Sequence, residues 1–293
     1  MSLTEVSAVC TDRVILDRWH PISALAETTP VPQRTQLLGA AIAHRRVGDP
    51  EPEVWLVDDA ETPDAGPPLP VLVRYGYVWT SLGDPIDLFE IPEFDEPDRR
   101  RLNAGSIHVA TSAPRAVENF LDLGHFPYVH TGLLGAEPHT EVTEYDVDIV
   151  DGEIWATRCQ FFQPQAAQNA SGGQMTQYTY RVPHPYCVLL YKSCAIDPTR
   201  RDTIGLFLQA TSPETCRAHN FLCMVDEEST DTQLRRFQQL IFGQDKPILE
   251  NQQPKRLPLD PRVETPIRAD KSAITYRRWL TELGVRYAVV PAD

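Results

Sequence analysis

The sequence predicts an α+β protein, in which helices precede and follow an antiparallel sheet. Residues 140–226 alternate apolar and polar side chains in successive runs, which is typical of antiparallel strands. Turn signals at Asp151-Gly152 and around Asp197-Pro198 separate these runs, and residues 163–174 are expected to form a loop. From residue 231 onward the apolar positions change to a helical period.

Composition places the chain among globular proteins and excludes some partners. Its 293 residues allow one large domain or two modest ones, and its net charge of -14 opposes attraction to nucleic acid or anionic membranes. No apolar run approaches the roughly 18 residues of a membrane span. No secretory signal is visible at the N-terminus, so we expect a cytoplasmic protein with reduced thiols on its six scattered cysteines.

The first hundred residues predict a small domain of short strands. Apolar runs at Leu37 to Ile42, Val54 to Val57 and Val71 to Val78 each indicate a strand that needs burial, against the rest of the chain or another subunit. A link rich in Pro and Asp follows at residues 83–102. We therefore predict one domain over residues 1–104 and a second over residues 105–293.

The second domain opens with a candidate metal-binding segment. Ser112 can cap a helix, and on that helix Asp122 and His125 would share one face. Pro127 is expected to bend the chain at Phe126 and so turn His130 back toward His125. Two imidazoles and one carboxylate with an open face form the facial site of non-haem Fe(II) oxygenases. Alternatively, two histidines five apart are ordinary surface or core residues.

A distant carboxylate is needed as the third ligand. Residues 234, 237, 241, 245 and 248 form an apolar helical seam in which position 245 is Asp245. A buried carboxylate needs compensation, which a metal cation provides. Alternatively, Asp245 pairs with an arginine or the helix ends at Gly243. Gly243 and Pro247 indicate a kink, and a last helix is predicted from about Lys271 to Leu283.

Two motifs resemble the signatures of Rieske-type non-haem iron oxygenases. The stretch ENFLDLGHFPYVH (118–130) resembles the family's iron motif, and GQDKPILENQQP (243–254) resembles its second signature. The match is closest to the branch with vanillate O-demethylase and the bacterial N-demethylases. The resemblance implies a helix-grip catalytic domain, a Rieske-like N-terminal domain, and a mononuclear Fe(II) held by His125, His130 and Asp245. It also implies a homotrimer or hetero-oligomer.

One departure from this family concerns the [2Fe–2S] cluster. A Rieske centre needs two cysteines and two histidines, and no cysteine here begins the family's C-x-H half-site. Cys216 and His219 have the spacing of the other half, but their segment alternates like a strand. The N-terminal domain is therefore expected to be a degenerate remnant without cluster ligands. Electrons would come from an external partner, either a cluster-bearing subunit or a reductase with an extra Rieske domain.

The resemblance implies a monooxygenase that uses O2 and NAD(P)H-derived electrons to hydroxylate a methyl group. Collapse of the product releases formaldehyde, and the expected substrate is small, planar and aromatic or heterocyclic, specifically a methylxanthine. In the family, the residue at the position of Asp122 forms a hydrogen bond to an iron-ligating histidine and links it to the Rieske cluster of the neighbouring subunit. Helical spacing places Asn119 near the iron, and Gln238 and Ile241 are candidate pocket residues.

Two other classes stay open from the sequence. The chain could be a non-catalytic scaffold that stabilises an active homologue in a hetero-oligomer, or a module that binds an apolar ligand in the helix-grip cavity. Three intact candidate ligands argue against a scaffold, because a scaffold needs none of them. Iron content separates both alternatives from the enzyme.

Overall fold

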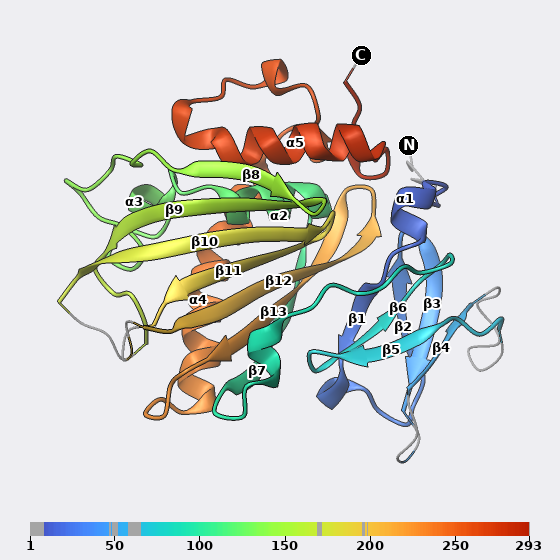
Figure 1. The fold of residues 1–293 in the computed structure, drawn as a ribbon. Helices are drawn as coiled ribbons and strands as arrows, with labels where there is room; N and C mark the ends of the chain where they lie inside the picture. Colours follow the sequence, from blue (N-terminus) through green and yellow to red (C-terminus); the bar gives the residue numbers. More distant parts are fainter. Residues whose placement is uncertain are drawn as a thin grey trace.

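The structure, a computed structural model, describes residues 9–46, 48, 52–57, 66–168, 172–194, 197 and 199–292. Its first part contains two small antiparallel sheets, and its second part contains one large sheet with helices (Figure 1). The predicted α+β class is confirmed. The predicted turn at Asp197-Pro198 and the predicted loop 163–174 lie partly outside the described residues, as does much of the link that would replace the cluster-binding loops.

The N-terminal strands are shorter than predicted because hairpin turns interrupt two of the apolar runs. Leu38 and Gly39 have φ of 52° and 85°, and Tyr75 and Gly76 have φ of 56° and 79°. Positive φ at both central residues is typical of tight hairpins. Each of the runs Leu37 to Ile42 and Val71 to Val78 therefore spans two strands joined by a turn, instead of the single strand predicted. The sheets are β1(His20–Ala24), β5(Val71–Arg74) and β6(Tyr77–Thr80), and β2(Gln33–Leu37), β3(Ala40–Arg45) and β4(Glu53–Leu56).

The large sheet is the predicted meander. Its strand order is β7-β13-β12-β11-β10-β9-β8, and every pair is antiparallel. Asp151-Gly152 forms the predicted turn between β8 and β9. The strands are β7(Arg100–Val109), β8(Asp146–Val150), β9(Glu153–Gln163), β10(Gln174–His184), β11(Cys187–Ser193), β12(Arg201–Ser212) and β13(Thr215–Met224).

The predicted domain boundary falls inside a strand. β7 begins at Arg100 and pairs with β13 along its length, so residues 100–104 already belong to the large sheet. Cys216 and His219 lie buried on β13, as their alternation indicated, and His219 Nδ1 is 2.8 Å from Ser106 Oγ. The division of the chain into domains stays a prediction.

The short N-terminal strands are buried against the large sheet of the same chain. Leu38 N–H donates to the Ala210 carbonyl at 2.7 Å, and Tyr77 Oη donates to the Asn220 carbonyl at 2.9 Å. An aromatic cluster fills the junction, in which the rings of Trp79 and Phe207 are 5.3 Å apart. This packing buries the apolar surface that two small sheets could not bury by themselves.

Three main helices accompany the large sheet: α2(Ala113–Leu121), α4(Asp231–Asn251) and α5(Lys271–Leu283) (Figure 1). Thr230 and Gln233 form a capping box that starts α4, and α5 has the predicted bounds. The buried face of α4 differs from the predicted seam: Ile248 is 45% exposed, and the buried positions are Leu234, Gln238, Phe242, Asp245 and Leu249. None of the helices in the described part of the chain combines the length and apolarity that a membrane crossing needs.

Candidate metal centre and its pocket

The segment that carries the two histidines consists of two short helices and not one bent helix. Ser112 caps α2 as predicted, but α2 ends at Leu121, and Asp122 is its C-cap. The Asp122 carboxylate accepts a hydrogen bond from Gly124 N–H at 2.7 Å, which favours a turn over continued helix. Pro127 therefore lies in the first turn of α3(Phe126–Val129), where a missing N–H costs nothing. The bend falls at residues 122–125, earlier than predicted.

A close backbone contact holds this segment in place. Gly135 lies against the peptide between Phe126 and Pro127, and a Cβ at residue 135 would be 2.6 Å from Pro127 N. Only glycine allows such an approach. The chain after His130 therefore packs directly on the helix that precedes His130.

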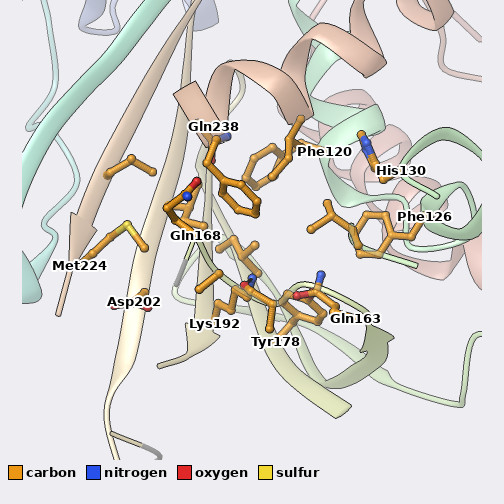
Figure 2. A pocket seen from close by; sticks show the side chains of 18 of the residues that line it. Phe120, Phe126, His130, Gln163, Gln168, Tyr178, Lys192, Asp202, Met224 and Gln238 are labelled. Atoms are coloured by element: carbon orange, nitrogen blue, oxygen red, sulfur yellow. Dashed lines mark hydrogen bonds between the residues drawn. The ribbon is translucent and has the colours of Figure 1, made fainter. Parts of the chain in front are cut away.

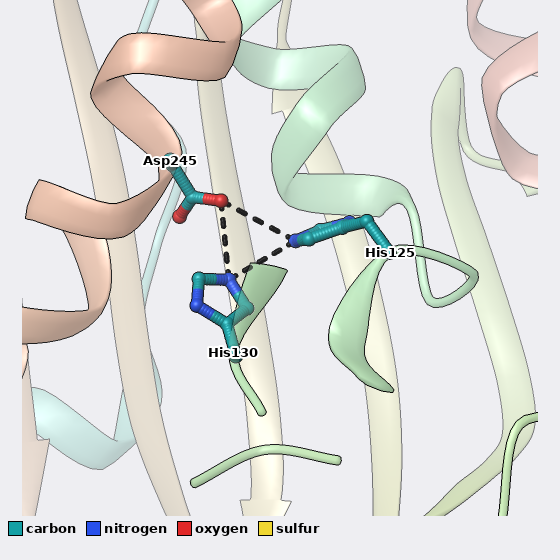
Figure 3. A group of neighbouring side chains, drawn as sticks. All are labelled: His125, His130 and Asp245. Atoms are coloured by element: carbon teal, nitrogen blue, oxygen red, sulfur yellow. Dashed lines mark hydrogen bonds and ion pairs between the residues drawn. The ribbon is translucent and has the colours of Figure 1, made fainter. Parts of the chain in front are cut away.

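The structure brings His125, His130 and Asp245 together (Figure 3). Asp245 Oδ1 lies 3.3 Å from His125 Nε2 and 3.1 Å from His130 Nε2, and the two Nε2 atoms are 3.1 Å apart. Ligands about 2.1 Å from one metal ion and at right angles to each other would be about 3.0 Å apart. The triangle of ligand atoms therefore has the dimensions of a facial metal site.

The hydrogen bonds on the far side of each ring explain why a cation fits here. His125 Nδ1 lies 3.1 Å from the Asp122 carboxylate, and His130 Nδ1 lies 2.9 Å from Gln244 Oε1. Both partners accept, so each Nδ1 carries the proton and each Nε2 presents a lone pair. These lone pairs and the buried Asp245 Oδ1, which has no hydrogen-bond donor in the described residues, converge on one point. A metal ion relieves the repulsion between them.

The electrostatics of the site also favour a positive charge. Burial lowers the pKa of His125, but the negative charges of the Asp122 and Asp245 carboxylates beside its ring outweigh burial and raise this pKa to about 9. Burial raises the pKa of Asp245, and the two imidazoles outweigh it, so the net shift is downward. A bound divalent cation meets the same demand for positive charge as a proton does.

The three candidate ligands line an apolar pocket between α4 and the large sheet. Figure 2 shows this pocket with His130 among its side chains. Cross-strand neighbours build its floor: Tyr180 opposes Leu190, Leu190 opposes Ile204, and Tyr178 opposes Lys192. The predicted pocket residues Gln238 and Ile241 line it from α4. Aromatic side chains of Phe120, Phe126, Tyr178 and Tyr180 add flat walls, which suit a planar ligand.

A second, polar cavity lies on the other side of His125. Asn119, Asp122 and His125 line it together with Glu264 and Arg277. Asn119 lines both cavities and thus lies beside His125. Asp122 lines the polar cavity and not the apolar pocket, and 31% of its side chain is exposed. Asp122 therefore connects His125 to a polar, accessible part of the surface.

Three residues at the site were missed from the sequence. Gln244 forms a hydrogen bond to His130, and its position directly before the predicted ligand Asp245 could have identified it as a site residue. Lys192 lies buried in the pocket wall and donates a hydrogen bond to the Ala166 carbonyl. Gln163, at the end of β9, is 1% exposed and also lines the pocket. Alternation indicated that Lys192 belongs to a strand, but it could not indicate which strand face meets the helices. Gln163 was expected to begin a loop and instead ends β9.

A facial site of two histidines and one aspartate, set beside an apolar pocket, defines a mononuclear non-haem iron oxygenase. Residues 109–286 match the family of the vanillate O-demethylase oxygenase C-terminal domain. A probable methylxanthine N7-demethylase from Pseudomonas sp. (strain TJI-51) is 47% identical over 277 residues, which are 93% of this chain and 96% of that protein. The chain therefore belongs to the Rieske-type non-haem iron oxygenases of the vanillate O-demethylase branch.

Two further similarities agree with this assignment. The methylxanthine N1-demethylase of Pseudomonas putida is 28% identical over 216 residues, which are 72% of this chain and 59% of that protein. The solved structure of Pseudomonas putida CBB5 NdmA with caffeine has a TM-score of 0.74 at 19% identity, and the match covers 92% of this chain and 91% of that chain. The structural likeness shows the fold alone. Membership of the family implies a mononuclear iron and O2 as co-substrate.

Proposed function

We propose that this chain is the catalytic component of an oxidative N-demethylase that acts on a methylxanthine-like substrate. The methyl group, O2, two electrons and two protons give a hydroxymethyl group and water. The hydroxymethyl compound then loses formaldehyde and leaves an N–H group on the ring. The substrate class is supported by the similarity to a probable methylxanthine N7-demethylase.

The observation that carries this proposal is the convergence of three ligand atoms in the lining of an apolar pocket. Fe(II) held by His125, His130 and Asp245 would supply the activation of O2. The pocket residues bind the ring between aromatic walls and direct its methyl group toward the ligands. Exclusion of water by these walls protects the reacting groups.

Other residues have supporting roles in the proposal. Asp122 and Gln244 hold the tautomers of the two imidazoles. Asn119 orients groups beside His125 without binding the metal. Gln238 and Ile241 contact the substrate from α4, opposite the sheet.

The electrons come, in this proposal, from an external partner that carries a Rieske centre. Cysteine ligands for a [2Fe–2S] cluster are missing from the sequence pattern, while Asp122 opens on a polar cavity beside His125. A partner docked over this cavity would deliver electrons through Asp122 and His125. A homotrimer or hetero-oligomer would present such a contact between subunits.

Formaldehyde release tests the activity. Purified iron-loaded protein, O2, NADH, 7-methylxanthine and a reductase with an extra Rieske domain should give one formaldehyde for each molecule demethylated. His125→Ala should abolish both iron binding and formaldehyde. A scaffold subunit would instead lack stoichiometric iron and tolerate this change. Robust turnover with an ordinary flavin reductase alone would refute the external Rieske donor.

A pair of conservative variants tests the electron route. Asp122→Asn keeps one oxygen for Gly124 N–H, but its NH2 group replaces the oxygen that accepts from His125 Nδ1, so both this hydrogen bond and the negative charge are lost. We expect turnover per bound iron, measured at saturating Fe(II), to fall by at least tenfold. Asp270→Asn, in the same polar cavity, is the matched control and should stay within twofold of wild type. Equal losses in both variants would argue against a specific role for Asp122.

A further inference from the structure

Unpaired polar atoms occupy one side of the apolar pocket. Both side-chain amide atoms of Gln163 and the hydroxyl of Tyr178 are buried without a hydrogen-bond partner in the described residues. Gln163 is 1% exposed and Tyr178 is 2% exposed. Buried polar groups are nearly always paired, so each unpaired one calls for an explanation. Among the lining residues that the structure describes, the only other such atom is Asp245 Oδ1, which faces the metal position.

The charged groups in the same wall are already engaged. Lys192 donates to the Ala166 carbonyl, and Asp202 accepts from Val225 N–H at 2.8 Å. Lys192 and Asp202 are also direct cross-strand neighbours, so their opposite charges offset each other. The groups left for a ligand on this side are therefore the neutral ones of Gln163 and Tyr178 (Figure 2).

We propose that Gln163 and Tyr178 recognise the lactam edge of the substrate. A primary amide offers one acceptor and two donors, so Gln163 pairs with an N–H and the adjacent carbonyl of a cyclic amide. The Tyr178 hydroxyl donates to a second carbonyl oxygen. This inference rests on the proposed function and adds to it the selection of substrates that keep an unmethylated lactam N–H.

The aromatic rings beside these groups define the plane of the ligand. The rings of Tyr178 and Tyr180 are 6.1 Å apart and inclined by 26°, and the ring of Phe126 meets Tyr178 edge-on at 6.2 Å. These rings contact one another and together form one wall, and a flat ligand ring packed against that wall presents its edge, and not its face, to Gln163. Edge recognition by a buried amide discriminates strongly, because a ligand without the N–H leaves the amide unpaired.

An internal role for Gln163 is the competing explanation. Thr176 Oγ1, on the neighbouring strand β10, is also buried without a partner, and a trapped water could bridge it to the amide. In that case Gln163 stabilises the sheet and has no contact with the substrate. The two explanations predict opposite effects on the stability of the ligand-free protein.

Calorimetric titration of the iron-loaded protein with two probes tests the inference. 7-Methylxanthine has lactam N–H groups, and caffeine carries methyl groups in their place. We expect wild type to bind 7-methylxanthine at least tenfold more tightly than caffeine. Gln163→Leu should weaken 7-methylxanthine binding at least tenfold and change caffeine binding less than twofold. Tyr178→Phe should weaken 7-methylxanthine binding by a smaller factor, and Thr176→Val, the control, should change neither.

Thermal unfolding of the ligand-free variants gives a second readout. Gln163→Leu should raise the melting temperature, because it removes an unpaired amide from an apolar wall. A lower melting temperature, equal changes for both probes, or no change for either would overturn the inference. Wild type that binds neither xanthine would overturn it as well. The demethylase proposal is decided separately by iron content and formaldehyde release.

Discussion

Gln244 Oε1 accepts a hydrogen bond from His130 Nδ1 at 2.9 Å, from the residue directly before the candidate ligand Asp245. The same short segment of α4 thus supplies a ligand and the group that orients another ligand. Because His130 is only 1% exposed, its ring has no water to replace this bond. Gln244 therefore fixes which nitrogen of His130 faces the metal.

Loss of this hydrogen bond should weaken the metal site. We expect Gln244→Leu to lower iron affinity about 10- to 100-fold, the usual effect of removing a group that orients a metal ligand. Gln239→Leu is the matched control, since Gln239 lies on the same helix and donates to the Ala104 carbonyl, away from His130. Competition with a chelator measures both affinities. Equal iron affinity in the two variants would contradict the role of Gln244.

Asp245 should be needed for stoichiometric iron. Asp245→Ala removes the only carboxylate among the three candidate ligands, so the remaining two imidazoles bind a hard divalent cation weakly. We expect iron per chain to fall to less than a tenth of the wild-type value by elemental analysis. Asp148→Asn, exposed on β8, controls for the loss of one negative charge and should keep its iron. Full iron in Asp245→Ala would rule out this ligand set.

The residues that the sequence located correctly are those whose signal is local. Hydrophobic alternation predicted the meander, the apolar positions near the C-terminus predicted the bounds of α5, and caps predicted the start of α2. The apolar periodicity of α4 predicted that Ile248 is buried, but Ile248 is exposed. Rotating the buried face of a helix by one residue changes its apolar pattern little, so the pattern does not fix the face. Pro127 was expected to bend the chain at Phe126, but it lies in the first turn of α3. The bend comes earlier because the turn at Asp122 and Gly124 depends on a side-chain hydrogen bond, which the sequence pattern does not reveal.

The residues of the pocket wall could not be predicted from the sequence for a different reason. Gln163 and Lys192 come from two strands of the large sheet, and their proximity to α4 depends on how the helix crosses the sheet. Strand alternation tells which residues share a face, but it does not tell what covers that face. The close approach of Asp245 to the histidines was expected from the family resemblance, since a separation of 115 residues between His130 and Asp245 carries no geometric information.

Lys192 should make stability depend on pH in the alkaline range. Burial lowers the pKa of Lys192 from 10.5 to about 8. Between these values the unfolded chain holds a proton that the folded chain has lost, so this residue makes stability rise with pH. The shift corresponds to about 3 kcal/mol at about 1.4 kcal/mol per pH unit. The cost of the buried charge is present in full below pH 8 and disappears above pH 10.5.

Urea unfolding of wild type and Lys192→Met from pH 7 to 10.5 checks this sign. The variant has no ammonium to desolvate, so wild type should gain stability relative to the variant as pH rises through this range. Lys271→Met, on the exposed start of α5, is the matched control. A difference that stays constant, or one that changes in the variant's favour, would contradict the burial of a charged Lys192.

Glu118 should be essential to the packing of α2 against α5. Its carboxylate accepts hydrogen bonds from Arg277 at 2.5 and 2.9 Å and from Arg115 at 3.3 Å, and Glu118 is only 8% exposed. Glu118→Ala leaves two guanidinium groups in a buried site with less negative charge, and breaking such a network costs about 3–5 kcal/mol. The exposed pair of Asp146 and Arg158 offers a contrast, because Asp146→Ala should cost much less stability than Glu118→Ala. Chemical denaturation measures both losses. Because α2 leads directly into the metal-binding segment, the Glu118 variant should also bind iron less tightly, and a loss of stability below 1 kcal/mol would show that the network does not hold the two helices together.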